Sequence, residues 1–404
     1  MRILIDFQGA QGFGSGRGIG TYTVEFSRSM MACDPAKYEV YILLNLSVVD
    51  GLADLLKEIS FFCDRDKIFG FFVPKDSDCQ SKTWISQALT NRRSVVNKVN
   101  PDFIVLTSLF EPPGSSIISA IDPLIDCAQT TILYDLIPKS NPERYLKTNI
   151  AKESYESSIN HLLNSDLILT ISDYTASVFE KTFSYHHRPK TSVVGTATMK
   201  RTSSLSGKSR STFGEKEIFG KELMTKLCIG NNFLLTVSGQ DERKNLRLLL
   251  EAFLNLDTSV GNNYNLVIIC HLDDTEKNKL VDEISGNTFL KKNIIFTGYL
   301  TSFELDVLYR LCSLFIFPSL QEGFGLPVLE AMTFGAPCLI ANTSSMPEVG
   351  GKACVFFDAS SREDLKNKIM MLLNNESLLI KLSQKSIERS KEFSWEKVAK
   401  KTLK

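Results

Sequence analysis

The sequence predicts an α/β protein with two halves, each a parallel β-sheet covered by helices. Short apolar runs alternate with helix-length amphipathic segments along the 404 residues. Such alternation is typical of parallel sheets with helices on their faces. The alternation breaks once, in a polar stretch at residues 196–214, and then resumes. Because this length suggests two or three domains, the polar stretch is a natural linker.

The apolar runs give the expected strands. In the first half they cover residues 2–6, 38–46, 103–108, 131–136 and 167–172, with helices from about residue 22 and over 147–164. In the second half they cover residues 233–237, 266–270, 294–297, 314–317 and 337–341, and the tail from residue 363 is helical. Ligands of such proteins bind outside the carboxyl ends of the strands, so we expect the site in a cleft between the halves.

Composition excludes several classes of protein. Lys and Arg number 46, as do Asp and Glu, so the chain lacks the basic excess of a nucleic-acid-binding protein. We expect no signal peptide, and no stretch of about 18 apolar residues predicts a membrane span. The nine cysteines contain no C-x-x-C pair, which favours buried free thiols in a reducing, cytoplasmic compartment.

The segment 318–332 is the strongest candidate for chemistry. It runs from a predicted strand through a loop with two glycines into a helix whose first turn holds Pro327. Glu322 on the loop and Glu330 one turn into the helix are able to face one ligand, and paired carboxylates suit sugar hydroxyls. The alternative is a structural turn in which Glu322 is solvated and Glu330 caps the helix. Spacing alone favours neither.

Three other segments also follow predicted strands. Arg243 and Lys244 are adjacent at a strand–helix junction and suit a diphosphate, unless the turn is merely solvated. The glycine-rich loop 9–20 lacks both the G-x-G-x-x-G spacing and a Walker lysine, which argues against dehydrogenases and P-loop proteins. Tyr134 and Asp135 close a strand, where Asp135 either points into the cleft or caps the strand.

No metal site is expected. Two D-x-D patterns, at residues 64–66 and 76–78, lie among mixed polar residues and are more typical of solvated loops. The four histidines show no metal-ligand spacing.

Together these segments resemble family 4 of the retaining glycosyltransferases, which have the GT-B fold of two Rossmann-like domains facing across a cleft. Glu322 and Glu330 match the E-x7-E motif of that family. Residues 243–245, 298–300, 346–349 and 172–175 give supporting matches, and the opening residues 6–20 resemble bacterial O-antigen mannosyltransferases. The resemblance covers most of the chain and is weakest over 48–100 and 197–228.

The resemblance implies a role for each matching residue. Glu322 would lie beside the donor sugar, and Glu330 would bind the ribose. Arg243 and Lys244 would neutralise the leaving diphosphate. The backbone of Gly323, Phe324, Gly325 and Leu326 would contact sugar and phosphate, Tyr299 would join the donor site, Gly18 and Gly20 would line the cleft, and Tyr134 and Asp135 would lie at the reaction centre.

Two positions depart from the family pattern. Tyr134 stands where many relatives have a histidine, and a tyrosine of ordinary pKa near 10 is a poor proton shuttle. Gln240 stands where relatives often carry an arginine, so Arg243 must supply the second positive charge. The glutamates and Lys244 remain, and we therefore expect activity.

The resemblance also implies the domain organisation and the reaction. Residues 1–196, completed by a helix at 386–404, would bind the acceptor; 197–228 would link the domains; 229–385 would bind the nucleotide sugar. The expected reaction is metal-independent transfer of a hexose, with mannose from GDP-mannose as the best guess, to a glycan or polyprenyl-diphosphate-linked acceptor. The alternatives are a non-catalytic scaffold and a sugar-nucleotide epimerase.

Peripheral association with the inner face of the bacterial membrane is a further hypothesis. It depends on residues that mix basic and apolar side chains in one predicted helix: Lys82, Arg92, Arg93, Lys98, Trp84, Ile85, Leu89 and Val96. An ordinary surface helix is the alternative explanation of this pattern.

Overall fold

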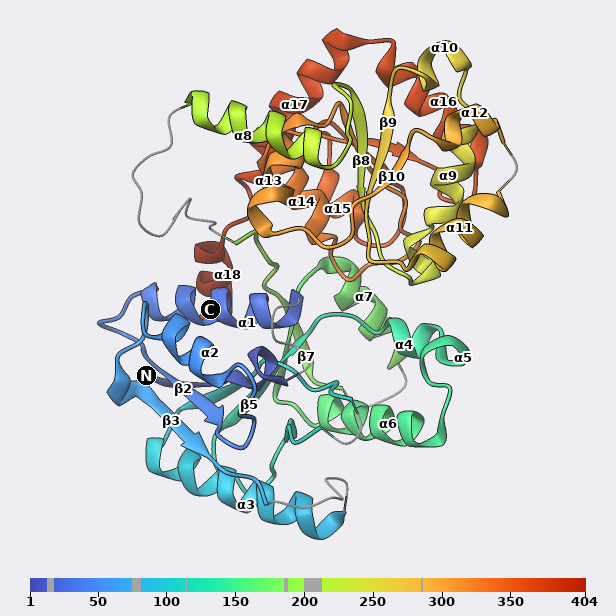
Figure 1. The fold of residues 1–404 in the computed structure, drawn as a ribbon. Helices are drawn as coiled ribbons and strands as arrows, with labels where there is room; N and C mark the ends of the chain where they lie inside the picture. The colour runs from blue at the N-terminus through green and yellow to red at the C-terminus, as the bar shows by residue number, and fades with distance from the viewer. Residues whose placement is uncertain (13–17, 75–80, 113–114, 185–187, 200–212, 285) are drawn as a thin grey trace. The chain divides into compact units, whose positions relative to one another are not determined.

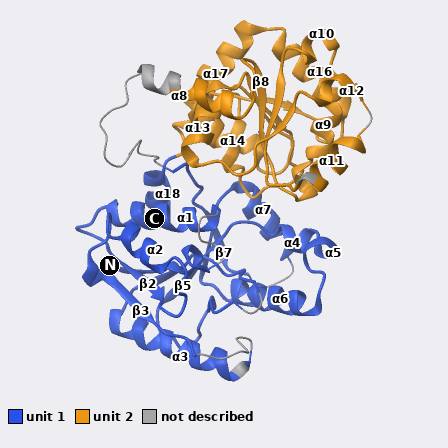
Figure 2. Cartoon of the chain, viewed as in Figure 1, with its two compact units in different colours: residues 1–199, 394–404 blue, residues 200–393 orange. Residues whose placement is uncertain are grey.

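A computed structural model describes residues 1–12, 18–74, 81–112, 115–184, 188–199, 213–284 and 286–404 (Figure 1). The chain divides into two compact units (Figure 2). Unit 1 comprises residues 1–199 and 394–404, and unit 2 comprises residues 200–393. Both sheets are parallel, as expected.

Unit 1 is built on a seven-stranded sheet in the order β3-β2-β1-β4-β5-β6-β7. Every described strand pair in it is parallel. The strands are β1 Arg2–Asp6, β2 Glu39–Asn45, β3 Ile68–Phe71, β4 Phe103–Leu106, β5 Ala128–Leu133, β6 Leu167–Thr170 and β7 Lys190–Val193. The helices are α1 Gly18–Ala32, α2 Leu52–Ile59, α3 Lys82–Val99, α4 Ile137–Ser140, α5 Pro142–Tyr145, α6 Asn149–Leu163, α7 Asp173–Thr182 and α18 Trp395–Thr402, with 3-10 turns η1 Phe7–Ala10 and η3 Arg65–Lys67.

Unit 2 is built on a six-stranded sheet in the order β10-β9-β8-β11-β12-β13, again with parallel pairs. The strands are β8 Phe233–Val237, β9 Asn265–Ile269, β10 Ile294–Phe296, β11 Leu314–Phe317, β12 Cys338–Ala341 and β13 Val355–Phe357. The helices are α8 Phe213–Lys226, α9 Leu246–Leu254, α10 Thr258–Gly261, α11 Asp274–Asp282, α12 Thr288–Lys291, α13 Ser302–Leu311, α14 Leu326–Thr333, α15 Met346–Gly350, α16 Arg362–Leu373 and α17 Glu376–Ser390, with the 3-10 turn η4 Glu242–Lys244.

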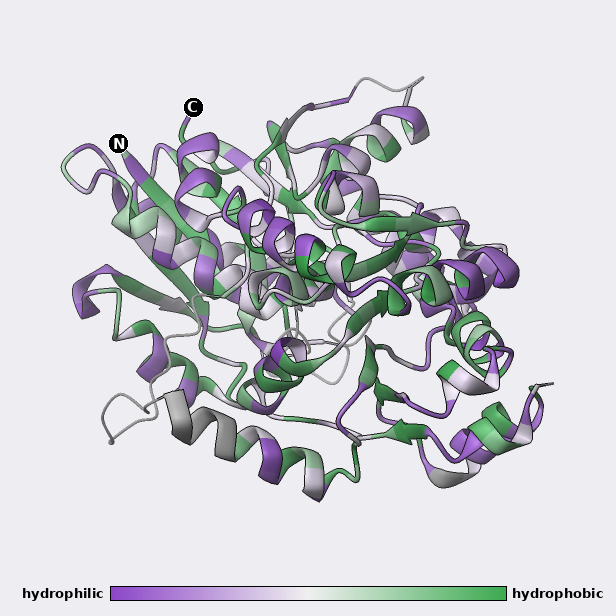
Figure 3. Ribbon diagram, turned by 90° about the horizontal axis from the view of Figure 1, so that it is seen from above, coloured by the Kyte–Doolittle hydropathy of each residue, from purple (hydrophilic) through white to green (hydrophobic). Residues whose placement is uncertain are grey.

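The strands are apolar because helices cover both faces of each sheet. All four residues of β11 and all four of β12 are buried, which is why these strands appear in the sequence as continuous apolar runs rather than alternating ones. Figure 3 shows the strands mostly green and much of the purple on the helices and loops around them.

The C-terminal segment returns to unit 1. Helix α17 belongs to unit 2 as far as Ser390, and the part in unit 1 starts at Ser394 rather than at the expected residue 386. The Trp395 ring packs edge-on against Tyr22 of α1 at 5.0 Å between centroids. Its indole Nε1 donates to the Thr198 carbonyl at 3.0 Å, and its own carbonyl accepts from Ser29 Oγ at 2.6 Å.

Helix α3 does not present the surface that motivated the membrane hypothesis. Trp84 and Val96 are buried, and Arg92 is fully buried against Asp6, 2.9 Å away. Arg93 is paired with Asp122 at 2.9 Å. Four of the side chains that suggested a membrane-facing helix are thus buried or paired within unit 1, whereas Lys98 is exposed. Among the described residues, no helix is both long and apolar enough to cross a bilayer.

The cysteines in the described part of the chain are free thiols, as predicted. Burial is less uniform than expected, because Cys228 is exposed and Cys33 and Cys127 are half-buried. Cys79 and the second D-x-D pattern, residues 76–78, lie outside the described residues.

Candidate active site

The Glu322 loop joins the end of β11 to the start of α14. Gly325 is the residue before the helix and has φ +104°, a value that L side chains rarely adopt. A Cβ there would lie 2.3 Å from Met346 Cε. The loop can therefore turn sharply into α14 only because this position is glycine.

Arg243 and Lys244 lie on η4, just beyond the end of β8. Strand β8 pairs in parallel with β11, so the loops that follow the two strands leave the sheet at the same edge. Asp241 fixes the turn by accepting from the Arg243 backbone N–H at 3.0 Å and from its guanidinium Nε at 2.9 Å.

The two cations meet on the Glu322 carboxylate. Lys244 Nζ lies 2.7 Å from Oε1, and Arg243 Nη1 lies 2.8 Å from Oε2. Ser319 Oγ also contacts Oε1 at 2.7 Å. The Glu322 side chain is only 12% exposed, so this ion cluster of Glu322, Arg243 and Lys244 is largely desolvated. Glu322 is thus not the solvated loop residue of the structural alternative.

The cluster keeps Glu322 ionised. Burial by itself raises the pKa of a carboxyl group. Here the positive charges of Lys244 and Arg243, with hydrogen bonds from Lys244 and Ser319, outweigh burial and lower the Glu322 pKa below its usual range.

The backbone ties the two loops together as well. The Leu320 N–H donates to the Arg243 carbonyl at 2.7 Å, and Arg243 Nη1 donates to the Gln321 carbonyl at 2.8 Å. Ser319, which was not predicted as a site residue from the sequence, is fully buried and donates to the Arg243 carbonyl at 3.1 Å. The available signal was a serine two residues beyond a buried strand, at the edge where ligands bind.

Glu330 lies on α14 and is held by a buried tyrosine. Its Oε2 accepts from Tyr309 Oη at 3.2 Å, and Tyr309 of α13 is fully buried. Glu330 is not a helix cap, because Gly325 occupies the N-cap and no acidic residue lies in the first turn. A half-buried carboxylate is suited to accepting hydrogen bonds from hydroxyl groups.

The other predicted donor residues of unit 2 differ in exposure. Gly323 is buried and Leu326 is half-buried. The Phe324 ring packs edge-on against Phe393, 5.7 Å between centroids, so only its backbone is suited to ligand binding. Tyr299 is 84% exposed beyond β10 and stacks on His271 at 4.8 Å.

In unit 1, Tyr134 and Asp135 are engaged by their own unit. Tyr134 Oη donates to the Thr107 carbonyl at 2.9 Å, and burial raises the Tyr134 pKa well above its usual range. Asp135 Oδ1 accepts from the Ile137 N–H at 2.9 Å, which matches the capping alternative. Gly18 and Gly20 lie in the first turn of α1, the former exposed and the latter buried.

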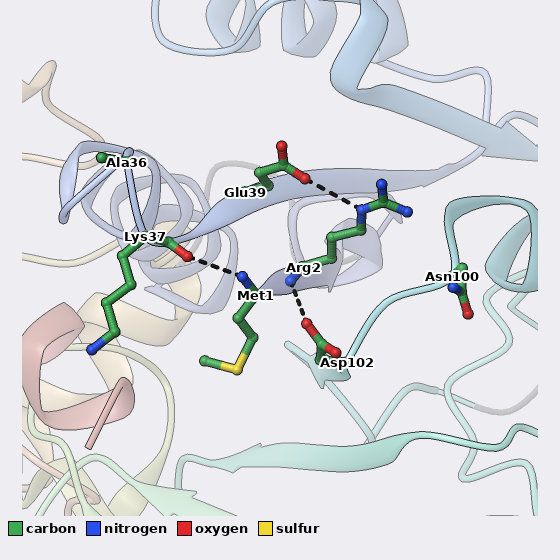
Figure 4. Close-up of a pocket in the computed structure, with 7 residues that line it drawn as sticks. All are labelled: Met1, Arg2, Ala36, Lys37, Glu39, Asn100 and Asp102. Atoms are coloured by element: carbon green, nitrogen blue, oxygen red, sulfur yellow. Dashed lines mark hydrogen bonds and ion pairs between the residues drawn. The ribbon is translucent and has the colours of Figure 1, made fainter.

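A cavity of about 430 Å³ opens at the edge of the unit 1 sheet opposite to the one where Tyr134 and Asp135 lie (Figure 4). It lies at the amino ends of β1, β2 and β4. There the Met1 ammonium donates to the Lys37 carbonyl, and Arg2 Nε donates to the Glu39 carboxylate. None of the predicted site residues line it. Nor do any three His, Cys, Asp or Glu side chains of the described chain gather as a metal site would.

Comparison with known proteins agrees with this geometry. Residues 225–393 match the family described as Glycosyl transferases group 1. Unit 2 carries a group 1 glycosyltransferase domain. The ion cluster, Glu330 and the Glu322 loop all lie within the matched residues of this domain.

The relatives of the chain support the resemblance found in the sequence. The serotype-specific mannosyltransferase WbdA of Escherichia coli is 29% identical over 99% of the chain and 47% of its own length. The O-antigen chain mannosyltransferase B of Escherichia coli is 28% identical over 68% of each protein. The chain thus spans about half the length of the WbdA relatives that it matches.

Solved structures confirm the fold. HepE from Anabaena, in complex with UDP-glucose, aligns with a TM-score of 0.68 and 15% identity over 100% of this chain and 98% of its own. WaaG, a glycosyltransferase of lipopolysaccharide biosynthesis, aligns with a TM-score of 0.64 and 13% identity, over the same shares of the two chains. The group 1 domain and its companion unit thus have the expected GT-B fold.

Proposed function

We propose that this chain is a retaining glycosyltransferase that moves mannose from GDP-mannose to a glycan or lipid-linked oligosaccharide acceptor of a bacterial surface polysaccharide. The observation that carries the proposal is the desolvated cluster of Glu322, Arg243 and Lys244 at the carboxyl edge of the unit 2 sheet. Two adjacent cations and a carboxylate there match the two parts of the donor, an anionic diphosphate and a hydroxyl-rich sugar.

Each group has a part in breaking the bond between the anomeric carbon and the diphosphate oxygen. Arg243 and Lys244 stabilise the negative charge that grows on the diphosphate as it leaves. The N–H groups at the start of α14 add to this field. Glu322 is ionised and faces the positive charge that develops on the sugar, while Glu330 binds the ribose hydroxyls.

The acceptor hydroxyl attacks from the face that the diphosphate leaves, so the configuration at the anomeric carbon is retained. Its proton passes to the departing phosphate oxygen. Tyr134 is no proton shuttle in this scheme, because its hydroxyl donates to Thr107 and its pKa is raised. Positioning and charge stabilisation supply most of the rate enhancement.

The donor and acceptor rest on the relatives. WbdA and O-antigen chain mannosyltransferase B are named for mannose transfer in serotype or O-antigen synthesis, and GDP-mannose is our proposed source of that mannose. HepE binds UDP-glucose. A UDP-linked sugar is therefore the competing donor, and an experiment must distinguish it from GDP-mannose.

Release of nucleotide from a panel of donors tests the proposal. We expect GDP release from GDP-mannose, unchanged by EDTA and lost in Glu322→Ala and Lys244→Ala. Lys226→Ala is the matched control, because Lys226 also pairs with a glutamate of unit 2 but is 69% exposed. Conversion of the nucleotide sugar to an isomer that still carries its nucleotide would favour an epimerase. Binding without turnover would favour a scaffold.

A further inference from the structure

Three consecutive hydroxyl side chains hold the Glu322 loop from the side. Thr343, Ser344 and Ser345 follow β12 and precede α15, so their loop lies beside the one that follows β11. We call these three residues the hydroxyl clamp. They directly precede the 346–349 match but were not themselves identified from the sequence.

Each clamp residue contacts a different part of the loop backbone. Thr343 Oγ1 donates to the Ser319 carbonyl at 2.8 Å. Ser344 Oγ accepts from the Glu322 N–H at 3.0 Å. Ser345 Oγ lies 2.8 Å from the Phe324 carbonyl and 3.1 Å from the Glu322 carbonyl, and it shares its proton between them. Both backbone polar groups of Glu322 are therefore fixed by side chains of the clamp.

The clamp also sets the direction of two amides. In a trans peptide the N–H points away from the carbonyl of the preceding residue. Because Ser345 holds the carbonyls of Glu322 and Phe324, the N–H groups of Gly323 and Gly325 point to the side opposite the clamp. Ser345 is fully buried, so water does not replace it as a partner for these carbonyls.

We propose that Thr343, Ser344 and Ser345 are positioning residues for the donor diphosphate. Ser345 sets the direction of the Gly323 and Gly325 amides before the donor arrives, and Thr343 and Ser344 fix the loop backbone at Ser319 and Glu322 that leads into them. The binding site then needs no reorganisation when the phosphates enter, which is the condition for strong electrostatic stabilisation. This inference rests on the proposed function, because it takes a diphosphate as the ligand.

The test compares ligands with and without phosphates on the full chain. GDP, UDP, guanosine and uridine are titrated by calorimetry into wild type, Ser345→Ala and Ser344→Gly. Ser344→Gly guards against misfolding, because Ser344 has φ +48° and glycine adopts that conformation without strain. Ser390→Ala is the matched control, since it also removes a hydroxyl-to-carbonyl bond from unit 2, at 2.9 Å within α17.

We expect both clamp variants to bind the preferred nucleoside diphosphate roughly tenfold more weakly, the loss typical of one charge-assisted hydrogen bond. Their affinity for the matching nucleoside, and the diphosphate affinity of Ser390→Ala, should stay within about twofold of wild type. The positioning role would be overturned if both clamp variants bound the diphosphate as tightly as wild type, or if they lost equal affinity for nucleoside and diphosphate. Either result would leave the proposed function standing. A wild-type chain that binds neither diphosphate would overturn the proposed function and this inference with it.

Discussion

At the scale of single residues, the most informative feature is that Glu322 neutralises the cations expected to bind the donor. Arg243 and Lys244 both contact its carboxylate, and Arg243 also contacts Asp241. A diphosphate that reaches these cations must therefore compete with a carboxylate already in place. The carboxylate that supports transfer should thus weaken the binding of the nucleotide product.

Glu322→Gln should accordingly bind GDP more tightly than wild type while losing transfer. Removing one negative charge beside two desolvated cations should improve affinity by roughly tenfold. Calorimetry with GDP measures the first effect, and nucleotide release from GDP-mannose measures the second. Glu330→Gln is the control, because Glu330 is held by Tyr309 and is proposed to bind the ribose rather than the diphosphate, so it should not gain affinity. Weaker GDP binding by Glu322→Gln would contradict the competition.

The same carboxylate predicts how stability depends on pH. Because the Glu322 pKa is lowered in the folded protein, its ion pairs stabilise unit 2 at any pH above the usual carboxyl pKa. That contribution disappears as the pH falls through the lowered value. The stability difference between wild type and Glu322→Gln should thus be constant from about pH 7 to about pH 5 and shrink below about pH 4. Urea unfolding across this range measures it, and a difference that shrinks above pH 5 would show that the pKa is not lowered.

At the scale of elements, the sequence predicted the central strands well and the edges poorly. All ten predicted strands are present. Nine of them are inner strands, which appear as continuous apolar runs because both faces of the sheet are covered, and the tenth, β10, is an edge strand. The missed strands are β3, β7 and β13, and each lies at the edge of its sheet. A polar sequence explains the miss only for β7, which is Lys-Thr-Ser-Val, because β3 and β13 are apolar segments of four and three residues. Lys190 at the start of β7 is exposed.

The residues of the candidate site were also predicted only in part. Glu322, Arg243 and Lys244 were predicted because charged residues beyond strands stand out in a sequence. The hydroxyl clamp and Ser319 were missed because serine and threonine are common in loops, and their contacts depend on which strands are neighbours. The burial of Arg92 was missed for a related reason, since its partner Asp6 is distant in sequence.

The buried pair between α3 and β1 should be essential to unit 1. Arg92→Ala would leave the Asp6 carboxylate buried without its cation, a change that typically destabilises by about 3–5 kcal/mol. Lys139→Ala, which removes a partly exposed ion pair with Glu156, should cost less than about 1 kcal/mol. Chemical denaturation compares the two, and equal effects would show that burial of Arg92 does not matter.

At the scale of the whole molecule, the two units should be distinguishable during unfolding. The chain has two tryptophans, Trp84 and Trp395, and both lie in unit 1. Tryptophan fluorescence therefore follows unit 1, whereas far-ultraviolet circular dichroism follows the helices and strands of both units. Comparison of the two signals assigns a destabilised variant to its unit.

Gly325→Ala should lower only the stability of unit 2. The strained φ and the contact with Met346 should destabilise that unit by about 1–3 kcal/mol. The dichroism transition should shift to lower denaturant while the fluorescence transition stays in place. Gly239→Ala is the matched control, because a Cβ at that position meets no atom within 4 Å. A shift of both signals together would show that the units unfold as one.

The return of the chain to unit 1 at Ser394 determines the order in which the units can be completed during synthesis. A ribosome releases the chain from its N-terminus, so every residue of unit 2 emerges before Trp395. At that stage all residues of unit 2 have been synthesised, but α1 still lacks its partner α18 and the Trp395 ring that packs against Tyr22. Of the two units, the one made mostly from the earliest residues is thus the second that translation completes.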